Sequence, residues 1–230
     1  MCKRCGKTFG LLIHTRQKTI LINRCVELHN LGMPFRGISR VLKVSPQTVQ
    51  NWIKKKGKLV EQSLPGFCKT MEFDELFSFV NNRTNHQYVW IAVERETKNL
   101  LSVEIGRRRK VDFHRMWKKL KTVRVQNYCS DGYIVYNVTL PKTNHLKGKQ
   151  HTYTVEGMMS LLRHYLARFR RKTRCYSKSV EMMKYSLLVF MDSWNAWYLG
   201  SPQRFRFERI NRIAAPIFIS ISGVATRKSI

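Results

Sequence analysis

Three acidic residues stand in apolar or turn-forming settings of a chain that has few acids. Asp74 lies within MEFDELFSFV, Asp131 within YCSDGY, and Glu156 near the start of the amphipathic stretch TVEGMMSLLRHYLARFRR. The chain has 14 Asp and Glu against 43 Lys and Arg. Carboxylate oxygens suit Mg²⁺ or Mn²⁺, and a group of them can hold two ions that bracket one phosphorus. The three acids therefore predict a two-metal site that acts on phosphodiesters.

Each of these acids also has an ordinary structural interpretation. Asp74 could be a surface-facing strand residue, Asp131 with Gly132 a turn, and Glu156 an acid that favours a helix N-terminus. Their order along the chain, on elements that could bring them together, favours the functional interpretation.

The charge of the chain predicts a polyanionic partner. The formal net charge is +29, the sequence pI is about 10.4, and the basic residues are spread along the whole length. Lys and Arg that neutralise phosphates release counterions, so nucleic acid is favoured over an anionic membrane surface. No apolar run is long enough for a membrane span, and the N-terminus has no signal-type run. We expect a cytoplasmic, nucleoid-associated protein.

The cysteines give a weaker indication of metal binding. Cys2 and Cys5 form a Cys-x-x-Cys pair that could supply two thiolates to Zn²⁺, whereas the other four cysteines are scattered. Residues 1–16 are therefore interpreted as a partial zinc-finger-like segment.

Residues 17–57 predict a small all-α, helix-turn-helix domain. Ser45 is a favoured N-cap and Pro46 suits the first helical position, so VSPQTVQNWIKKK should be the last of three helices, with Val49 and Ile53 facing inward. In such a motif the last helix enters the major groove. The outward side chains expected to contact DNA are Gln47, Thr48, Gln50, Asn51 and Lys54. An ordinary three-helix bundle with a solvated polar face is the alternative.

The rest of the chain predicts an α/β domain. Residues 58–69, which begin at the end of the Lys cluster KKKGK and contain Pro65 and Gly66, are interpreted as a linker, and residues 196–230 as a tail of unknown role. Between them, residues 70–195 alternate as three strands, a helix at VDFHRMWKKLK, a strand ending at Asp131, an amphipathic helix over 154–171, and one more helix from Lys178. This order is the layout of a ribonuclease-H-like catalytic domain.

Several segments resemble the transposases of the IS-one insertion-sequence family, members of the DDE group. They are MEFDELFSFV, SDGY and TVEGMMSLLRHYLARFRRKTRCYSKSVEMM, together with the preceding helix-turn-helix pattern. The resemblance implies that Asp74, Asp131 and Glu156 are the catalytic, metal-binding triad. It also places a basic residue, Arg163, on the catalytic helix seven residues after Glu156.

The resemblance implies a DNA transposase that binds the terminal inverted repeats of its element, cleaves the ends and joins them to target DNA. Synapsis of two ends implies a homodimer or a larger assembly on double-stranded DNA. We expect the DNA backbone near the metals to be held by Arg163, Arg170, Arg171, Lys172 and Lys178.

Two alternatives remain open at this stage. The chain lacks the first Cys pair of the family's finger, and Gly-Met-Met follows Glu156 where family members tend to carry Arg and Asn. Both departures favour a catalytically degenerate DNA-binding protein that represses its element. A structure-selective nuclease on the same fold would keep the chemistry, but it would not need a helix-turn-helix.

Overall fold

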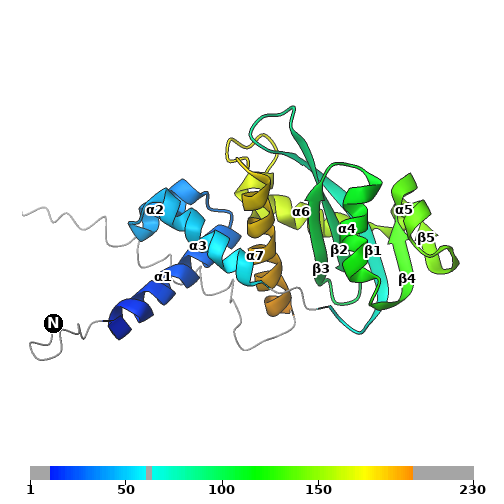
Figure 1. Ribbon diagram of the computed structural model, residues 1–230, viewed down its shortest axis with the longest axis horizontal. Coiled ribbons are helices and arrows are strands. Elements are labelled where there is room, and N and C mark those ends of the chain that lie inside the picture. Colours follow the sequence, from blue (N-terminus) through cyan, green and yellow to red (C-terminus); the bar gives the residue numbers. More distant parts are fainter. Residues whose placement is uncertain (1–10, 61–63, 199–230) are drawn as a thin grey trace, which may run out of the picture.

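The computed structural model describes residues 11–60 and 64–198 of the chain (Figure 1). Three N-terminal helices are followed by a mixed five-stranded sheet with helices on both faces. The helices are α1 (Leu11–Asn30), α2 (Phe35–Leu42), α3 (Pro46–Leu59), α4 (Lys110–Leu120), α5 (Ile134–Thr139), α6 (Tyr153–Tyr165) and α7 (Val180–Tyr198). The strands are β1 (Phe67–Phe79), β2 (His86–Glu94), β3 (Leu100–Gly106), β4 (Arg124–Ser130) and β5 (His145–Lys147). Short 3₁₀ turns are η1 (Lys142–Asn144), η2 (Lys149–His151) and η3 (Ala167–Phe169).

The sheet has the order β3-β2-β1-β4-β5. The first three strands form an antiparallel meander, as their alternating sequence predicts, whereas β4 joins β1 in parallel and β5 joins β4 in parallel. In the parallel pair Phe73 of β1 lies opposite Ser130, the last residue of β4. The arrangement places the end of β4 beside the middle of β1.

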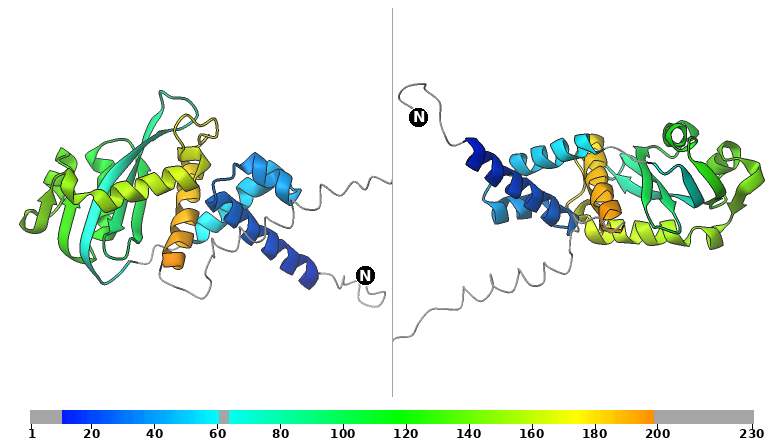
Figure 2. Two further views of the ribbon diagram at one scale, coloured as in Figure 1. Left: turned by 180° about the vertical axis from the view of Figure 1, so that it is seen from behind. Right: turned by 90° about the horizontal axis from the view of Figure 1, so that it is seen from below.

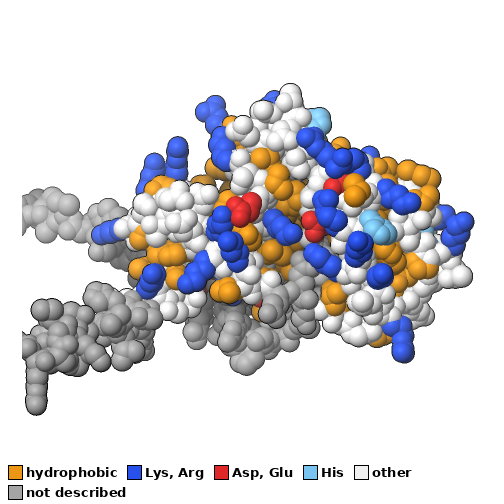
Figure 3. All heavy atoms as spheres, viewed as in Figure 1, with side chains coloured by type: hydrophobic (Ala, Val, Ile, Leu, Met, Phe, Trp, Pro, Cys, Tyr) orange, Lys and Arg blue, Asp and Glu red, His pale blue; other side chains and the backbone are white. Residues whose placement is uncertain are grey.

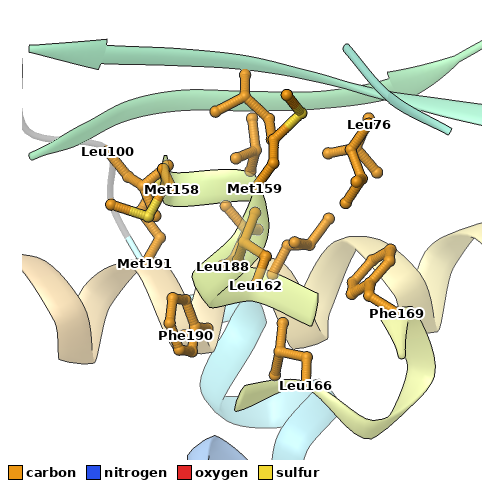
Figure 4. Close-up of a cluster of buried hydrophobic side chains, with 14 of the residues drawn as sticks. Leu76, Leu100, Met158, Met159, Leu162, Leu166, Phe169, Leu188, Phe190 and Met191 are labelled. Carbon is orange, nitrogen blue, oxygen red and sulfur yellow. The ribbon is translucent and has the colours of Figure 1, made fainter. Parts of the chain in front are cut away.

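The two faces of the sheet are covered by different helices. Met71 and Phe73 of β1 pack with Phe113 and Met116 of α4 and with Tyr136 of α5. On the other face the strands pack against α6 and α7, whose apolar side chains meet in one cluster (Figure 4). From behind, α6 is seen to cross the sheet on the side opposite α4 (Figure 2). Glu72 and Asp74 alternate with Met71 and Phe73, as the sequence pattern predicts, and the contact of Glu72 with Val155 shows that they face α6.

Helix α7 lies between the N-terminal helices and the sheet (Figure 1). Its Met183 and Leu187 belong to the cluster under the sheet, while Met182 and Val189 pack with Ile53 and other buried side chains of α1 to α3. At Gly57 of α3, an added Cβ would come within 2.7 Å of Tyr185 Cβ. The three N-terminal helices therefore share a core with a helix of the α/β part.

Helix α6 is shorter than the predicted helix over 154–171. It ends at Tyr165, Leu166 is extended, and the turn η3 follows. The apolar period continues through Phe169, but Arg168 is drawn into tertiary contacts. Its Nη1 donates to Ser177 Oγ at 3.0 Å and to the Met182 carbonyl at 3.3 Å, and its guanidinium lies 5.0 Å from the Phe35 ring. These contacts override the helical periodicity.

A second difference concerns residues 134–151. The sequence gives no clear pattern there, whereas the structure has α5, β5 and two 3₁₀ turns. None of the described helices is both long and apolar enough to cross a membrane.

Candidate active site

The three predicted acids lie on elements that meet where β4 ends beside the middle of β1. Because Phe73 and Ser130 are register partners, the residues that follow them, Asp74 and Asp131, start from adjacent backbone positions. The first turn of α6 is tied to β1 by the Val155 amide, which donates to Glu72 Oε2 at 2.9 Å. Glu156 follows Val155 directly and so enters the same region.

Asp74 has a strongly shifted pKa. It is partly buried, and its Oδ1 accepts a hydrogen bond from the Glu75 amide at 2.7 Å. Burial raises the pKa of Asp74 to about 7. This value includes the opposing effect of the Glu75 amide and smaller upward contributions from the negative charges of Glu75, Asp131 and Glu156. The three acids therefore share one electrostatic environment.

Asp131 and Glu156 are held by local contacts. Asp131 Oδ1 accepts from the Tyr133 amide at 2.9 Å, which closes a turn after β4. Glu156 is exposed in the first turn of α6, and its Oε1 accepts from Thr152 Oγ1 at 3.3 Å.

The donor set fits a hard divalent cation, although the site is not closed around one. Three carboxylates supply the oxygen ligands that Mg²⁺ and Mn²⁺ prefer, and a cation would relieve the repulsion that raises the pKa of Asp74. Within the described part of the chain, no three His, Cys, Asp or Glu side chains lie close enough together to hold a metal ion. The acids share an environment without forming a compact metal centre.

An open basic pocket of about 440 Å³ lies along the C-terminal half of α6, beyond Glu156. It is lined by Ser160, Arg163, His164, Arg170 and Arg171. Burial lowers the pKa of Arg163, the nearby charge of Arg171 lowers it further, and Asp74 opposes the shift. Arg163 is thus within electrostatic reach of both the pocket and the acids.

The predicted basic residues after Arg163 do not share one helical face. A helix over 154–171 would put Arg170 on the same face as Glu156 and Arg163, but α6 ends at Tyr165 and Arg170 follows η3, so this alignment is wrong beyond Arg163. Arg170 reaches the pocket by folding back, with Nη2 3.3 Å from the His164 carbonyl. Lys172 and Lys178 are exposed in the loop before α7, and Lys178 Nζ donates to the Tyr176 hydroxyl at 3.1 Å.

The predicted DNA-reading side chains on α3 occupy two environments. Ser45 caps α3 as expected, since its Oγ accepts from the Thr48 amide at 3.1 Å. Gln47 and Asn51 are exposed and joined by a 3.0 Å hydrogen bond, while Thr48 and Gln50 are partly buried. Lys54 instead pairs with Glu181 of α7 at 2.8 Å. Cys2 and Cys5 lie outside the described residues.

Four residues that hold the acids in place were not singled out from the sequence. They are Arg95, Arg108, Tyr133 and Tyr136, which contact the carboxylates or their immediate neighbours. Their positions depend on long-range packing, so no local spacing indicates them.

The comparison with protein families decides the class of the protein. A family model described as IS1 transposase matches residues 67–196. The chain belongs to the IS1 transposase family, the IS-one family of the sequence resemblance. The matched region contains Asp74, Asp131 and Glu156.

Similar proteins carry the same family name. The iso-IS1n protein InsB of Shigella dysenteriae is 30% identical over 121 residues, which cover 53% of this chain and 92% of the relative. The IS1 9 protein InsB of Escherichia coli K12 is 26% identical over 149 residues, covering 65% and 84% of the two chains. Among solved structures, a chain of the simian T-cell lymphotropic virus intasome in complex with PP2A regulatory subunit B56 gamma aligns with a TM-score of 0.35. Its sequence identity is 9%, and the alignment covers 77% of this chain and 66% of that one.

Proposed function

We propose that this IS1-family protein is a DDE-type DNA transposase with a ribonuclease-H-like core. It would bind the terminal inverted repeats of its element, cleave the ends and join the freed 3′-hydroxyls to target DNA. The observation that carries the proposal is the shared environment of Asp74, Asp131 and Glu156, in which the latter two help to raise the pKa of Asp74. The strand order β3-β2-β1-β4-β5, with β1 parallel to β4, supports such a core.

In this proposal Asp74, Asp131 and Glu156 hold two Mg²⁺ or Mn²⁺ ions. When bound, such ions supply activation of the attacking oxygen and charge neutralisation at the leaving oxygen. The chain's own contribution is to bring the three carboxylates together where β4 ends beside β1 and α6 begins, and to hold the DNA beside them.

The basic pocket would hold the DNA backbone. Arg163 is within reach of Asp74, and Arg170 and Arg171 line the same pocket, so phosphates near the scissile bond would meet fixed positive charge. Lys and Arg side chains also spread over the helical part and the sheet on the face shown in Figure 3, with few acids between them. Lys172 and Lys178 could add contacts from the adjoining loop.

The N-terminal helices would read the element ends as a helix-turn-helix. Residues 43–45 join α2 to α3, Lys43 has a left-handed backbone with φ 53°, and Ser45 caps the second helix. Short turns of this kind are typical of the motif. The exposed Gln47 and Asn51 are suited to base edges. Lys54 would reach DNA only by leaving Glu181. Two ends held together would require at least a dimer.

A strand-transfer assay tests this proposal. Purified protein would be mixed with labelled duplexes that carry the DNA flanking the coding region, a plasmid target and Mg²⁺ or Mn²⁺, beside Asp131→Ala. We expect metal-dependent joining that the substitution abolishes. Tight end binding without cleavage or joining under either metal would contradict the proposal and favour the degenerate, repressing DNA-binding protein. The absence of a compact metal centre in the described residues is the observation that keeps this second candidate.

A further inference from the structure

The residues on either side of Asp74 suggest how the other two acids are brought to it. Strand β1 carries Glu72 and Glu75 close to Asp74, and both glutamate side chains are almost fully buried, with exposures of 0% and 3%. Buried carboxylates are costly unless they are paired and hydrogen-bonded. Each of them makes such contacts, but with different parts of the site.

Glu72 is bound to the start of the helix that carries Glu156. Its Oε2 accepts from the Val155 amide at 2.9 Å, one of the first-turn amides of α6 that have no partner within the helix. Its Oε1 accepts from Arg95 Nε at 2.6 Å, and Arg95 Nη2 donates to the His151 carbonyl at 2.9 Å. Glu72 and Arg95 together fix the chain on both sides of the α6 N-terminus.

Glu75 is connected through Arg108 and Tyr133 to the turn that carries Asp131, on the opposite face of the sheet. It accepts from Arg108 Nε at 2.5 Å and from the Tyr136 hydroxyl at 2.6 Å. The Arg108 guanidinium lies 4.2 Å from the centre of the Tyr133 ring, and the Tyr133 hydroxyl donates to the Arg108 carbonyl at 2.9 Å. The Tyr133 amide then donates to Asp131 Oδ1. A continuous set of contacts therefore joins Glu75 to Asp131.

We propose that Glu72 and Glu75 are positioning residues, of which Glu72 places Glu156 and Glu75 places Asp131 relative to Asp74. The metal-binding part of this inference rests on the proposed function. The three acids belong to separate elements, and β1 would organise all of them through consecutive contacts. The substitutions Glu72→Gln and Glu75→Gln retain the side-chain shape and remove the charge that holds each arginine.

The matched control is Glu104→Gln. Glu104 is a buried carboxylate of strand β3, which β2 separates from β1, and it pairs with Arg115, Lys119 and Lys184 at 3.4 to 3.7 Å. Among the described residues its ion-pair partners are these three side chains, and none of them is one of the three acids or one of the residues that contact them. Its loss therefore reports the general cost of neutralising a buried, ion-paired glutamate in this sheet.

Manganese binding gives the first readout, measured by the paramagnetic resonance of free Mn²⁺ on the full chain. Loss of a residue that orients metal ligands typically weakens metal binding by about 10- to 100-fold, and we expect this for both variants. Glu104→Gln should change the Mn²⁺ affinity by less than about twofold, because substitutions at distant sites that share no partners are nearly independent of each other. In double variants, Glu75→Gln should reduce the Mn²⁺ affinity little further when Asp131 is already Asn. It should reduce the Mn²⁺ affinity by its full factor when Glu156 is Gln. Glu72→Gln should show the reverse pattern.

Hydrogen exchange without metal gives a second, independent readout. Glu72→Gln should speed exchange of the Val155 amide, and Glu75→Gln should speed exchange of the Tyr133 amide, each leaving the other segment unchanged. If either glutamate variant fails to fold, Arg95→Lys and Tyr136→Phe weaken the same two sets of contacts more gently.

The outcomes separate this inference from the proposed function. Failure of the unmodified protein to bind Mn²⁺ through Asp74, Asp131 and Glu156 would contradict the metal site, while exchange would still decide whether the two glutamates position their segments. Unchanged exchange in both segments would overturn the inference. So would Mn²⁺ affinities that match Glu104→Gln, or double variants whose effects simply add.

Discussion

At the scale of single residues, ionised Asp74 destabilises the folded protein. Its pKa is raised to about 7 from an ordinary value of 3.8, first by burial and then by the surrounding negative charges. The folded protein therefore binds a proton at Asp74 more tightly than the unfolded chain does. The associated stability is fully present below about pH 4 and is lost as the pH rises through 7. A bound cation would offset this cost, which links metal binding to folding.

We expect Asp74→Asn to stabilise the metal-free protein at pH 8. The gain should be a few kcal/mol, with roughly 4 kcal/mol as the upper limit for a shift of this size, and should vanish near pH 4. Urea unfolding at both pH values measures it, and with Mn²⁺ present the sign should reverse. Asp192→Asn is the control, because Asp192 is more exposed and pairs with Lys56 at 3.1 Å. A destabilised Asp74→Asn protein at pH 8 would show that ionised Asp74 is not strained.

The sequence indicates these acids more readily than the residues that hold them. Asp74, Asp131 and Glu156 stand out because acids are rare in the chain and the family segments contain them. Arg95 and Arg108 could not be singled out in this way. Arg108 belongs to the run RRRK, which has the composition of a solvated basic loop, and only the folded sheet brings it to Glu75.

At the scale of elements, the contact between α3 and α7 fixes the N-terminal helices to the α/β part. Gly57 is buried there, and an added Cβ would lie 2.7 Å from Tyr185 Cβ and 2.9 Å from Tyr185 Cα. Lys54 and Lys56 add ion pairs to Glu181 and Asp192 of α7. The predicted recognition helix therefore has its C-terminal half packed against α7.

A pair of glycine substitutions tests the tightness of this contact. Gly57→Ala gains helix propensity but overpacks against the Tyr185 backbone, so we expect a net loss of about 1 to 3 kcal/mol in the free energy of unfolding. Gly157→Ala in α6 meets nothing within 4 Å and should stabilise by roughly 0.5 to 1 kcal/mol. Denaturant unfolding measures both. Equal effects of the two substitutions would mean that α3 and α7 are not closely packed.

His29 of α1 lies where the N-terminal helices pack against α7. It is buried, its Nδ1 donates to Asn30 Oδ1 at 2.9 Å, and Asn30 Nδ2 donates to Ser193 Oγ of α7 at 2.8 Å. Burial lowers the pKa of His29 to about 3, and the charge of Arg168 adds to the shift, while the Asn30 hydrogen bond opposes it. The neutral ring is therefore the form that the fold accommodates.

Stability should consequently fall as the pH drops below 6.5. Below pH 6.5 His29 is protonated in the unfolded chain, whereas in the folded protein it stays neutral down to about pH 3. This difference lowers the free energy of unfolding by about 2 kcal/mol at pH 5. Urea unfolding between pH 5 and 7.5 should show a shallower pH dependence for His29→Gln than for the unmodified protein. Parallel curves would indicate that protonation of His29 does not weaken the fold.

Element prediction succeeded where periodic patterns were long. The strands β1 to β4 and the helices α4, α6 and α7 follow from alternation or amphipathic spacing. The short elements α5 and β5 have too few residues to show a period, and the end of α6 was missed because Arg168 forms its contacts through residues distant in sequence. The parallel pairing of β1 with β4, which brings Asp131 beside Asp74, is a property of the fold that local patterns do not contain.

At the scale of the whole molecule, the formal net charge of +29 favours binding to any nucleic acid. Such binding by itself says nothing about where the DNA lies. The basic pocket along α6, whose Arg163 interacts electrostatically with Asp74, gives a more specific expectation, because only phosphates that enter it release counterions through Arg163, Arg170 and Arg171. The salt dependence of binding can therefore locate the DNA path.

The combined change of Arg163, Arg170 and Arg171 to Gln should weaken the salt dependence of DNA binding. The negative slope of log K, the association constant, against log salt should become less steep by about 2 to 3, since each lost phosphate contact removes roughly 0.9. Fluorescence anisotropy with a labelled duplex, over a series of salt concentrations, measures the slope. The control changes three exposed lysines of α4 or its end, Lys110, Lys118 and Lys121, and so removes the same net charge on the opposite face of the sheet. If the DNA lies along α6, the control variant should bind more weakly because it has lost long-range attraction to DNA. Its salt dependence should keep most of the slope of the unmodified protein, because no phosphate contact is lost. Equal slopes for the two triple variants would mean that DNA follows no defined path past the acids, and strand transfer would then lack a positioned substrate.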